Sequence, residues 1–253
     1  MAWTKTVSHV HTDYSDDGNA SIESIIDSAR VAGVGAVAIT DHDTIDGARA
    51  LAAIAPPGLQ VIVGEEISTN QGHLIGLFLK RAIAPGQSAR ETAEQIRDQG
   101  GLVIAPHPFN RLFGCSLRDA VMDILDLIDA VEVCNAQNLS PLPNRRAERF
   151  AREHNLARIV GVDMHHRDHL AACFQWMPPF DSAESFRASL RQATLIKGRH
   201  SLSYFAKAAR IVIGSRAPWG VPADYGRNCT RRRGDELVDA GCGFESDVSL
   251  SGS

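Results

Sequence analysis

Histidines and carboxylates recur in short motifs over the first two thirds of the 253-residue sequence. In His9-Val10-His11 the two imidazoles can bind one ion, because residues i and i+2 of an extended chain point to the same side. Imidazoles and carboxylates together suit borderline divalent ions such as zinc, manganese and iron. The sequence therefore indicates a metal centre, and its further candidate motifs are T-D-H-D at His42, G-E-E-I-S at Glu66, A-P-H-P at His107, and D-x-H at Asp163 and His165.

Each of these motifs lies at the end of a short apolar or β-branched run that predicts a strand. The predicted strands are residues 6–8, 36–40, 59–63, 102–105 and 158–160. In a barrel of parallel strands the carboxyl ends meet at one rim, so side chains far apart in the sequence converge there. We expect one active site at this rim. His73 differs, since it precedes its apolar run LIGLFL, and this argument alone does not place it at the site.

Amphipathic segments of helical period alternate with the strands, which is the pattern of an α/β fold built from βα units. The predicted helices are residues 21–32, 88–99, 117–128 and 144–154, with another that begins at the capping pair Asp181 and Glu184; the later strands are residues 130–133 and 194–196. We expect one domain over residues 1–205. Residues 206–253 are rich in Gly, Ser, Pro and Arg, which predicts a poorly structured tail without a catalytic role.

The composition limits the class of protein. A formal net charge of −4 argues against a broadly basic nucleic-acid binder, and an aromatic content of 6% gives little sign of a platform for stacking bases. The five cysteines form no C-x-x-C pair, which favours reduced thiols, and no apolar run approaches transmembrane length. We therefore expect a cytoplasmic protein with no membrane partner and no obligate protein partner.

The motifs also stand in a recognisable order. From Val7 to Ser201 the chain resembles the PHP family, named for polymerase and histidinol phosphatase, and within it the small stand-alone metal-dependent phosphoesterases. The segments that carry the resemblance are HVHTDYSDD, AITDHDTIDG, VGEEIS, GHLIGLF, APHPFNR, DAVEVCNAQN and GVDMHH. The resemblance implies a distorted (β/α)7, TIM-like barrel that holds two or three divalent ions (manganese, zinc or iron) at the carboxyl rim of its strands.

The resemblance also implies a ligand set. In that set His9, His11, Glu66 and Asp163 hold one ion, Glu66 bridges to a second ion held by His73 and His107, and Asp16, His42 and His165 hold the third. Two positions depart from the family pattern. The usual S-D-G reads Ser15-Asp16-Asp17-Gly18, where Asp17 competes for the ligand role although the spacing from His11 favours Asp16. The usual G-S-D-A-H has the bulkier Met164 between Asp163 and His165.

The activity that the resemblance implies is hydrolysis of phosphate esters by a metal-bound hydroxide, with Glu66 and Asp163 as catalytic residues. We favour small phosphorylated metabolites or nucleotides as substrates. Arg111 is a candidate clamp for the phosphate, because a guanidinium fork matches phosphate geometry. Two alternatives remain open: a 5′-to-3′ exonuclease or oligoribonuclease acting on short nucleic acids, and a non-catalytic PHP-like module.

Several polar residues near the motifs have other expected roles. Glu65 should point away from Glu66, because successive side chains of a strand alternate. Asp41 and Asp43 flank His42 and could orient imidazoles. His200 is expected on the surface.

Overall fold

The computed structural model describes residues 2–111, 115–166, 169–201 and 204–205. These residues form an α/β fold around one sheet with the strand order β7-β6-β5-β4-β3-β2-β1-β8-β9. The strands are β1 (Thr4–Val10), β2 (Ala36–Ile39), β3 (Gln60–Thr69), β4 (Gly72–Leu77), β5 (Leu102–Ala105), β6 (Ala130–Asn135), β7 (Ala157–Gly161), β8 (Phe174–Met177) and β9 (Thr194–Ile196). The helices are α1 (Ile22–Ala32), α2 (Asp46–Ile54), α3 (Ala89–Asp98), α4 (Pro141–Glu153) and α5 (Ala183–Leu190), with a 3-10 helix η1 (Arg118–Ile124).

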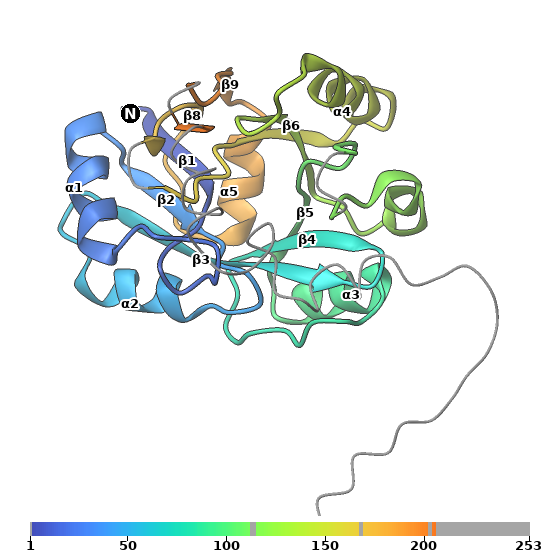
Figure 1. The fold of residues 1–253 in the computed structure, drawn as a ribbon, viewed down its shortest axis with the longest axis horizontal. Coiled ribbons are helices and arrows are strands. Elements are labelled where there is room, and N and C mark those ends of the chain that lie inside the picture. The colour runs from blue at the N-terminus through green and yellow to red at the C-terminus, as the bar shows by residue number, and fades with distance from the viewer. Residues whose placement is uncertain (1, 112–114, 167–168, 202–203, 206–253) are drawn as a thin grey trace, which may run out of the picture.

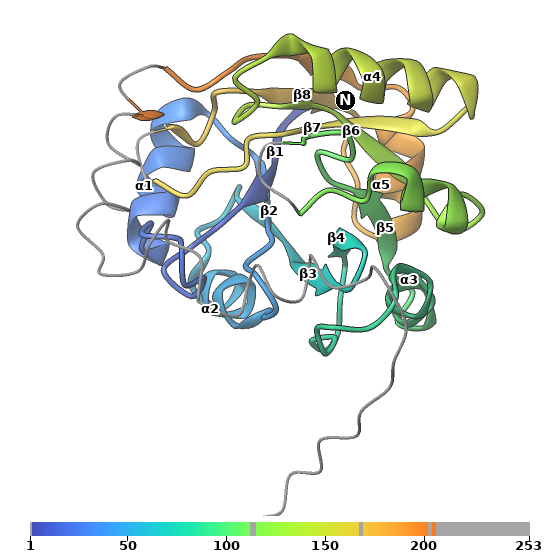
Figure 2. The same ribbon diagram turned by 45° about the vertical axis from the view of Figure 1, so that its right-hand side comes forward.

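The sheet curls until its first and seventh strands meet. The amide of Val162, just beyond β7, donates to the Ser8 carbonyl at 2.9 Å, and Val10 forms a parallel bridge with Met164. Strands β1 to β7 therefore enclose a nearly closed barrel, with α1 to α4 on its outside (Figures 1 and 2). α5 instead packs through Phe186 and Leu190 on the opposite face of the strands. This arrangement confirms the distorted seven-stranded barrel. β8 and β9 extend the sheet, since β8 pairs antiparallel with the first half of β1.

Helix ends follow the capping residues of the sequence. The Ser21 side chain accepts the amide of Ser24 at the start of α1, and Gly33 ends that helix with a left-handed φ of 64°. α3 begins with a capping box formed by Ser88 and Glu91. The apolar face of each helix packs on the sheet, and the short strands β2 and β5 are buried along their whole length. These elements place the strand ends that carry the motifs.

Some elements differ from the predictions. α2 and β8 were not predicted, and the residue before α2 is Ile45, which has no capping side chain to indicate the start of the helix. The predicted helix over residues 117–128 is the shorter 3-10 helix η1. α5 is capped by Ser182 and Ser185 rather than by Asp181 and Glu184. Strand β3 continues six residues past Val63 to Thr69, where it pairs with the antiparallel β4.

The predicted tail, residues 206–253, lies outside the described residues, as do Cys229 and Cys242. Among the residues that the structure describes, Cys134 and Cys173 are free thiols. Within the same residues, no helix has the length and apolar character needed to cross a membrane.

Candidate metal centre

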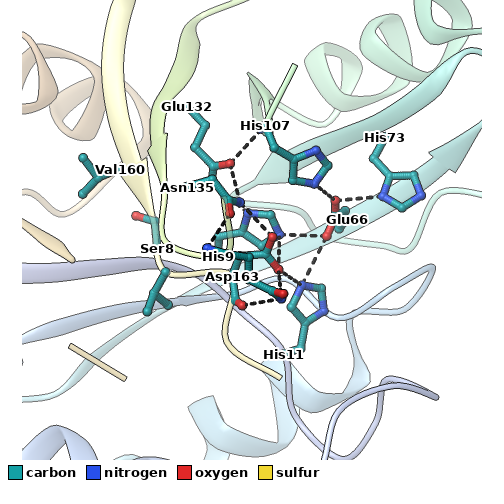
Figure 3. Close-up of polar contacts among 12 residues, drawn as sticks. Ser8, His9, His11, Glu66, His73, His107, Glu132, Asn135, Val160 and Asp163 are labelled. Carbon is teal, nitrogen blue, oxygen red and sulfur yellow. Dashed lines mark hydrogen bonds and ion pairs between the residues drawn. The ribbon is translucent and has the colours of Figure 1, made fainter. Parts of the chain in front are cut away.

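Glu66 lies at the middle of the site, and its side chain is only 1% exposed. One carboxylate oxygen, Oε2, lies 2.8 Å from His9 Nε2 and 3.2 Å from His11 Nε2. The other, Oε1, lies 2.8 Å from His73 Nδ1 and 3.0 Å from His107 Nε2 (Figure 3). The two oxygens of one carboxylate thus face two separate pairs of imidazoles.

His9 and His11 reach Glu66 through a bulge in β1. The pairing of β1 with β2 shifts between Val7 and Val10, so one strand contains an extra residue, and His9 has a left-handed φ of 65°. The two histidines therefore converge through a local distortion, and the regular alternation of an extended strand does not describe this segment. Such a backbone costs free energy in a residue other than glycine.

The antiparallel direction of β4 explains the position of His73. Because β4 runs opposite to its neighbours β3 and β5, its first residues lie at the rim where the parallel strands end. His73 stands near the start of β4, opposite Ser68 of β3. His107 reaches the same rim from the end of β5, with a φ of 27°. The structure thus brings His73 to the centre although it precedes its strand.

The third group contains Asp17 instead of the expected Asp16. Oδ2 of Asp17 lies 3.1 Å from His165 Nε2 and 3.5 Å from His42 Nε2, whereas Asp16, which is exposed like Asp17, is not part of the group. The reason is the turn at residues 15–18, in which Gly18 donates to the Ser15 carbonyl. A Cβ on Gly18 would meet the Thr12 carbonyl oxygen at 1.9 Å, so the glycine is required there. The carboxylate directly before this glycine is the one that reaches the histidines.

Asp163 joins the centre from the end of β7. Its Oδ1 lies 3.7 Å from His9 Nε2 and 3.4 Å from His165 Nδ1, and its φ is 49°. Its neighbour Met164 is fully buried in a core cluster that includes Val10, so the larger side chain at this position packs into the core. Left-handed backbone at His9, His107 and Asp163 places strain at three of the candidate ligands, which is typical of functional sites.

The charges of Glu66 and His11 suit metal ligands. Burial disfavours the ionised form of Glu66, but His9, His42 and His73 hold its pKa well below the usual range. Burial, together with His165 and His42, lowers the pKa of His11 to about 3. At neutral pH the Glu66 carboxylate is thus ionised and the His11 imidazole is neutral. Both are the forms that bind a cation.

The donor set fits divalent ions. Four groups of side chains could each hold an ion, because the candidate ligand atoms within each group lie within 4.8 Å of one another. The groups are His9, His11 and Glu66; His42, Glu66 and His73; His9, His107 and Asp163; and His11, Asp17, His42 and His165. Nε2 of His11 is buried and makes no hydrogen bond of acceptable geometry. A buried polar atom without a partner is costly, and a metal ion at this nitrogen would remove that cost. Such mixed imidazole and carboxylate donors are typical of divalent metal sites.

Three polar residues that the sequence analysis did not single out surround these groups. The Glu132 carboxylate contacts His9, the amide of Asn135 donates to Asp163 Oδ2 at 2.7 Å, and the amide of Gln137 lies 2.8 Å from His165 Nδ1. All three come from β6 or the loop after it. One signal was available in the sequence, because Glu132 interrupts an apolar run from Ala130 to Cys134, and a buried acid needs partners.

Other expected residues have structural positions. Glu65 points away from the centre, as expected, and is fully buried, where it accepts the Ile83 amide at 2.9 Å. Asp41 and Asp43 accept the backbone amides of Thr12 and Ser68 and so fix loops. Arg111 lies exposed, four residues after His107.

The expectation for His200 was wrong. Its side chain is 5% exposed, its Nε2 lies 2.8 Å from the Val162 carbonyl, and its ring stacks on Tyr204 at 3.8 Å. The hydroxyl of Tyr204 in turn accepts the backbone amide of His165 at 3.1 Å. This pair therefore supports the strand end that carries Asp163 and His165.

Comparison with known proteins gives a family match and several similar folds. Residues 8–142, more than half of the chain, match the family model of the PHP domain. An uncharacterized protein of Methanocaldococcus jannaschii is 41% identical over 150 residues, which cover 55% of this chain and 86% of that protein.

Three solved structures share the fold. PsfC from Pseudomonas syringae has a TM-score of 0.65 at 20% identity, covering 85% of this chain and 99% of that one. A two-domain protein from Bacteroides vulgatus, which contains a predicted PHP-like metal-dependent phosphoesterase, has a TM-score of 0.63 at 18% identity. The match covers 78% of this chain and 65% of that one. The lesion-specific endonuclease PfuEndoQ from Pyrococcus furiosus has a TM-score of 0.60 at 16% identity, and the match covers 76% of this chain and 57% of that one. This chain thus spans less than two thirds of the last two proteins.

Proposed function

This chain belongs to the PHP domain family, and from that premise we propose that it hydrolyses phosphate esters of small metabolites or nucleotides with two or three divalent metal ions. The observation that carries the proposal is the position of Glu66, whose two carboxylate oxygens face four imidazoles from β1, β4 and the end of β5. A carboxylate in this position can bridge two cations.

Each group of side chains has a distinct proposed role. Divalent ions held here would neutralise charge on the phosphoryl oxygens and lower the pKa of a bound water. Glu66 would supply negative charge to the ions held on either side of it, and Asp163 would add a second carboxylate on the side of His9 and His165. The amide groups of Asn135 and Gln137 hold Asp163 through hydrogen bonds of 2.7 and 3.1 Å. The chain needs no serine or cysteine nucleophile for this reaction.

Arg111 is proposed to bind the phosphate of the substrate. Arg111→Ala should raise KM about tenfold with a smaller change in kcat, because one charge-assisted hydrogen bond contributes about 1.5 kcal/mol or more to binding. Arg111→Lys should recover part of the loss, since lysine keeps the charge but lacks the planar fork. Steady-state kinetics on a phosphomonoester measures both. Arg30→Ala, which removes an exposed arginine that pairs with Asp27 on α1, is the control. An unchanged KM in Arg111→Ala would remove Arg111 from the site.

The experiment that tests the proposed function is a substrate screen. Protein reconstituted separately with manganese, zinc and iron is offered phosphate monoesters, nucleotides and short oligonucleotides. We expect metal-dependent release of phosphate from small monoesters. Faster cleavage of oligonucleotides than of any monoester would replace this proposal with the nuclease alternative. Bound ions without hydrolysis of any phosphate ester would contradict catalysis and favour a non-catalytic module.

A further inference from the structure

We propose that Glu132 is a positioning residue that fixes the tautomer of His9 and thereby sets the affinity of the centre for metal. This inference rests on the proposed metal site and assigns a role to a side chain outside the ligand set. Glu132 stands in β6 and is 2% exposed. In Figure 3 it lies behind His9 and His107, on the side away from Glu66.

The two oxygens of Glu132 contact different partners. Oε1 lies 2.8 Å from His9 Nδ1, and Oε2 accepts the backbone amide of His107 at 2.7 Å and the side-chain amide of Asn135 at 2.9 Å. The same Asn135 nitrogen donates to Asp163 at 2.7 Å. The Glu132 carboxylate thus contacts residues from β1 and from the end of β5, and Asn135 links it to Asp163 after β7.

The backbone at Gly161 leaves the space that the Glu132 carboxylate occupies. A Cβ on Gly161 would lie 1.4 Å from Glu132 Oε1 and 3.1 Å from the Cβ of His9. A glycine is therefore required at the end of β7 for the Glu132 side chain to reach His9. The pairing of β6 with β7 also shifts between Glu132 and Cys134, which is a bulge at the residue that follows Glu132.

The contact with Nδ1 decides which nitrogen of His9 can bind an ion. An ionised carboxylate only accepts hydrogen bonds, so Nδ1 of His9 must carry its proton toward Glu132. In the neutral ring Nε2 then has a lone pair, and Nε2 is the atom that lies 2.8 Å from Glu66 and 3.7 Å from Asp163. A carboxylate behind a ligating histidine fixes both the tautomer and the ring orientation.

Glu132→Gln should reverse this tautomer. An amide has one accepting oxygen and one donating nitrogen. The amide oxygen must occupy the position of Oε2, because two N–H donors, from His107 and Asn135, point there. The amide nitrogen then faces His9 Nδ1 and donates to it, which places the ring proton on Nε2, the nitrogen that would bind a metal ion. Glu132→Ala has no donor at this position and leaves His9 free to keep its proton on Nδ1.

The test is zinc affinity, measured on the full chain by competition with a chelator and accompanied by thermal unfolding. We expect Glu132→Gln to fold with a melting temperature near that of the wild type and to bind zinc about 10- to 100-fold more weakly. Glu132→Ala should lose more stability but less zinc affinity than Glu132→Gln. Long-range proton–nitrogen NMR of the zinc-loaded wild type should show His9 protonated at Nδ1. Glu65→Gln is the control, because Glu65 is equally buried and accepts only a backbone amide among its described contacts.

The outcomes separate this inference from the proposed function. Wild-type zinc affinity in Glu132→Gln would overturn the role of Glu132 alone. A Gln variant that binds zinc better than the Ala variant, or that fails to fold, would assign Glu132 to packing and would also overturn it. A wild-type protein that binds no zinc, manganese or iron would overturn the proposed metal site itself, and this inference with it.

Discussion

Glu66→Gln should lower kcat about a thousandfold while the protein stays folded. Glutamine keeps the size of the side chain but removes the charge that would hold two cations close together. Charge stabilisation by metal ions contributes several kcal/mol to a hydrolytic transition state, and a thousandfold loss corresponds to about 4 kcal/mol. The amide also places a donor opposite imidazoles, which lie at 2.8 to 3.2 Å from the present carboxylate oxygens. Turnover, circular dichroism and metal content together measure the effect.

Glu65→Gln is the matched control for this variant. It changes the adjacent residue in the same way, but Glu65 points away from the centre and accepts the Ile83 amide. Burial raises the pKa of Glu65 to about 7, so the neutral amide resembles a form that the native side chain already adopts near neutral pH. Activity should change little. An inactive Glu65→Gln beside an active Glu66→Gln would require the ligand assignment in G-E-E-I-S to be redrawn.

Asp17→Asn should lower activity about a hundredfold and remove one ion per chain. Asp17 is the carboxylate between His42 and His165, and these two imidazoles hold its pKa well below the usual range. Without the Asp17 carboxylate, the group keeps only the imidazoles of His11, His42 and His165. A divalent ion binds less tightly to neutral imidazoles alone than to a group that includes a negative charge. Elemental analysis and kinetics on the same preparation measure both effects.

Asp16→Asn separates the two neighbouring carboxylates. Asp16 is exposed and lies outside the group formed by His11, Asp17, His42 and His165. The activity and metal content of the Asp16→Asn variant should therefore stay within about twofold of the wild type, as for most exposed substitutions. The opposite ranking, with Asp16→Asn inactive and Asp17→Asn active, would show that the turn at residues 15–18 places the earlier carboxylate at the metal.

The fold could be predicted because its signals are local. The helix at residues 22–32 has a serine cap, an apolar stripe and a terminal glycine, and the strands at residues 36–39 and 102–105 are short apolar runs. The antiparallel β4 was harder, because a strand carries no sign of its direction in its own sequence. The position of His73 became clear only once β4 was paired with β3 and β5.

The site was predictable to the level of its motifs but not of its geometry. Spacing from His11 favoured Asp16, whereas the turn geometry depends on Gly18 and selects the residue directly before it. The bulge at His9 has no sequence signal that we recognise. His200 appeared to be a surface residue because its partners, the Val162 carbonyl and the Tyr204 ring, are brought to it only by the tertiary fold.

The most direct test of the account is the number of metal ions per chain. Protein purified without chelator and reconstituted with excess manganese, zinc or iron is freed of unbound metal and analysed for its elements against a protein concentration from amino-acid analysis. We expect two or three ions per chain, because the candidate ligand atoms gather in overlapping groups around Glu66 and Asp17. Substantially less than one ion per chain with every metal would contradict it.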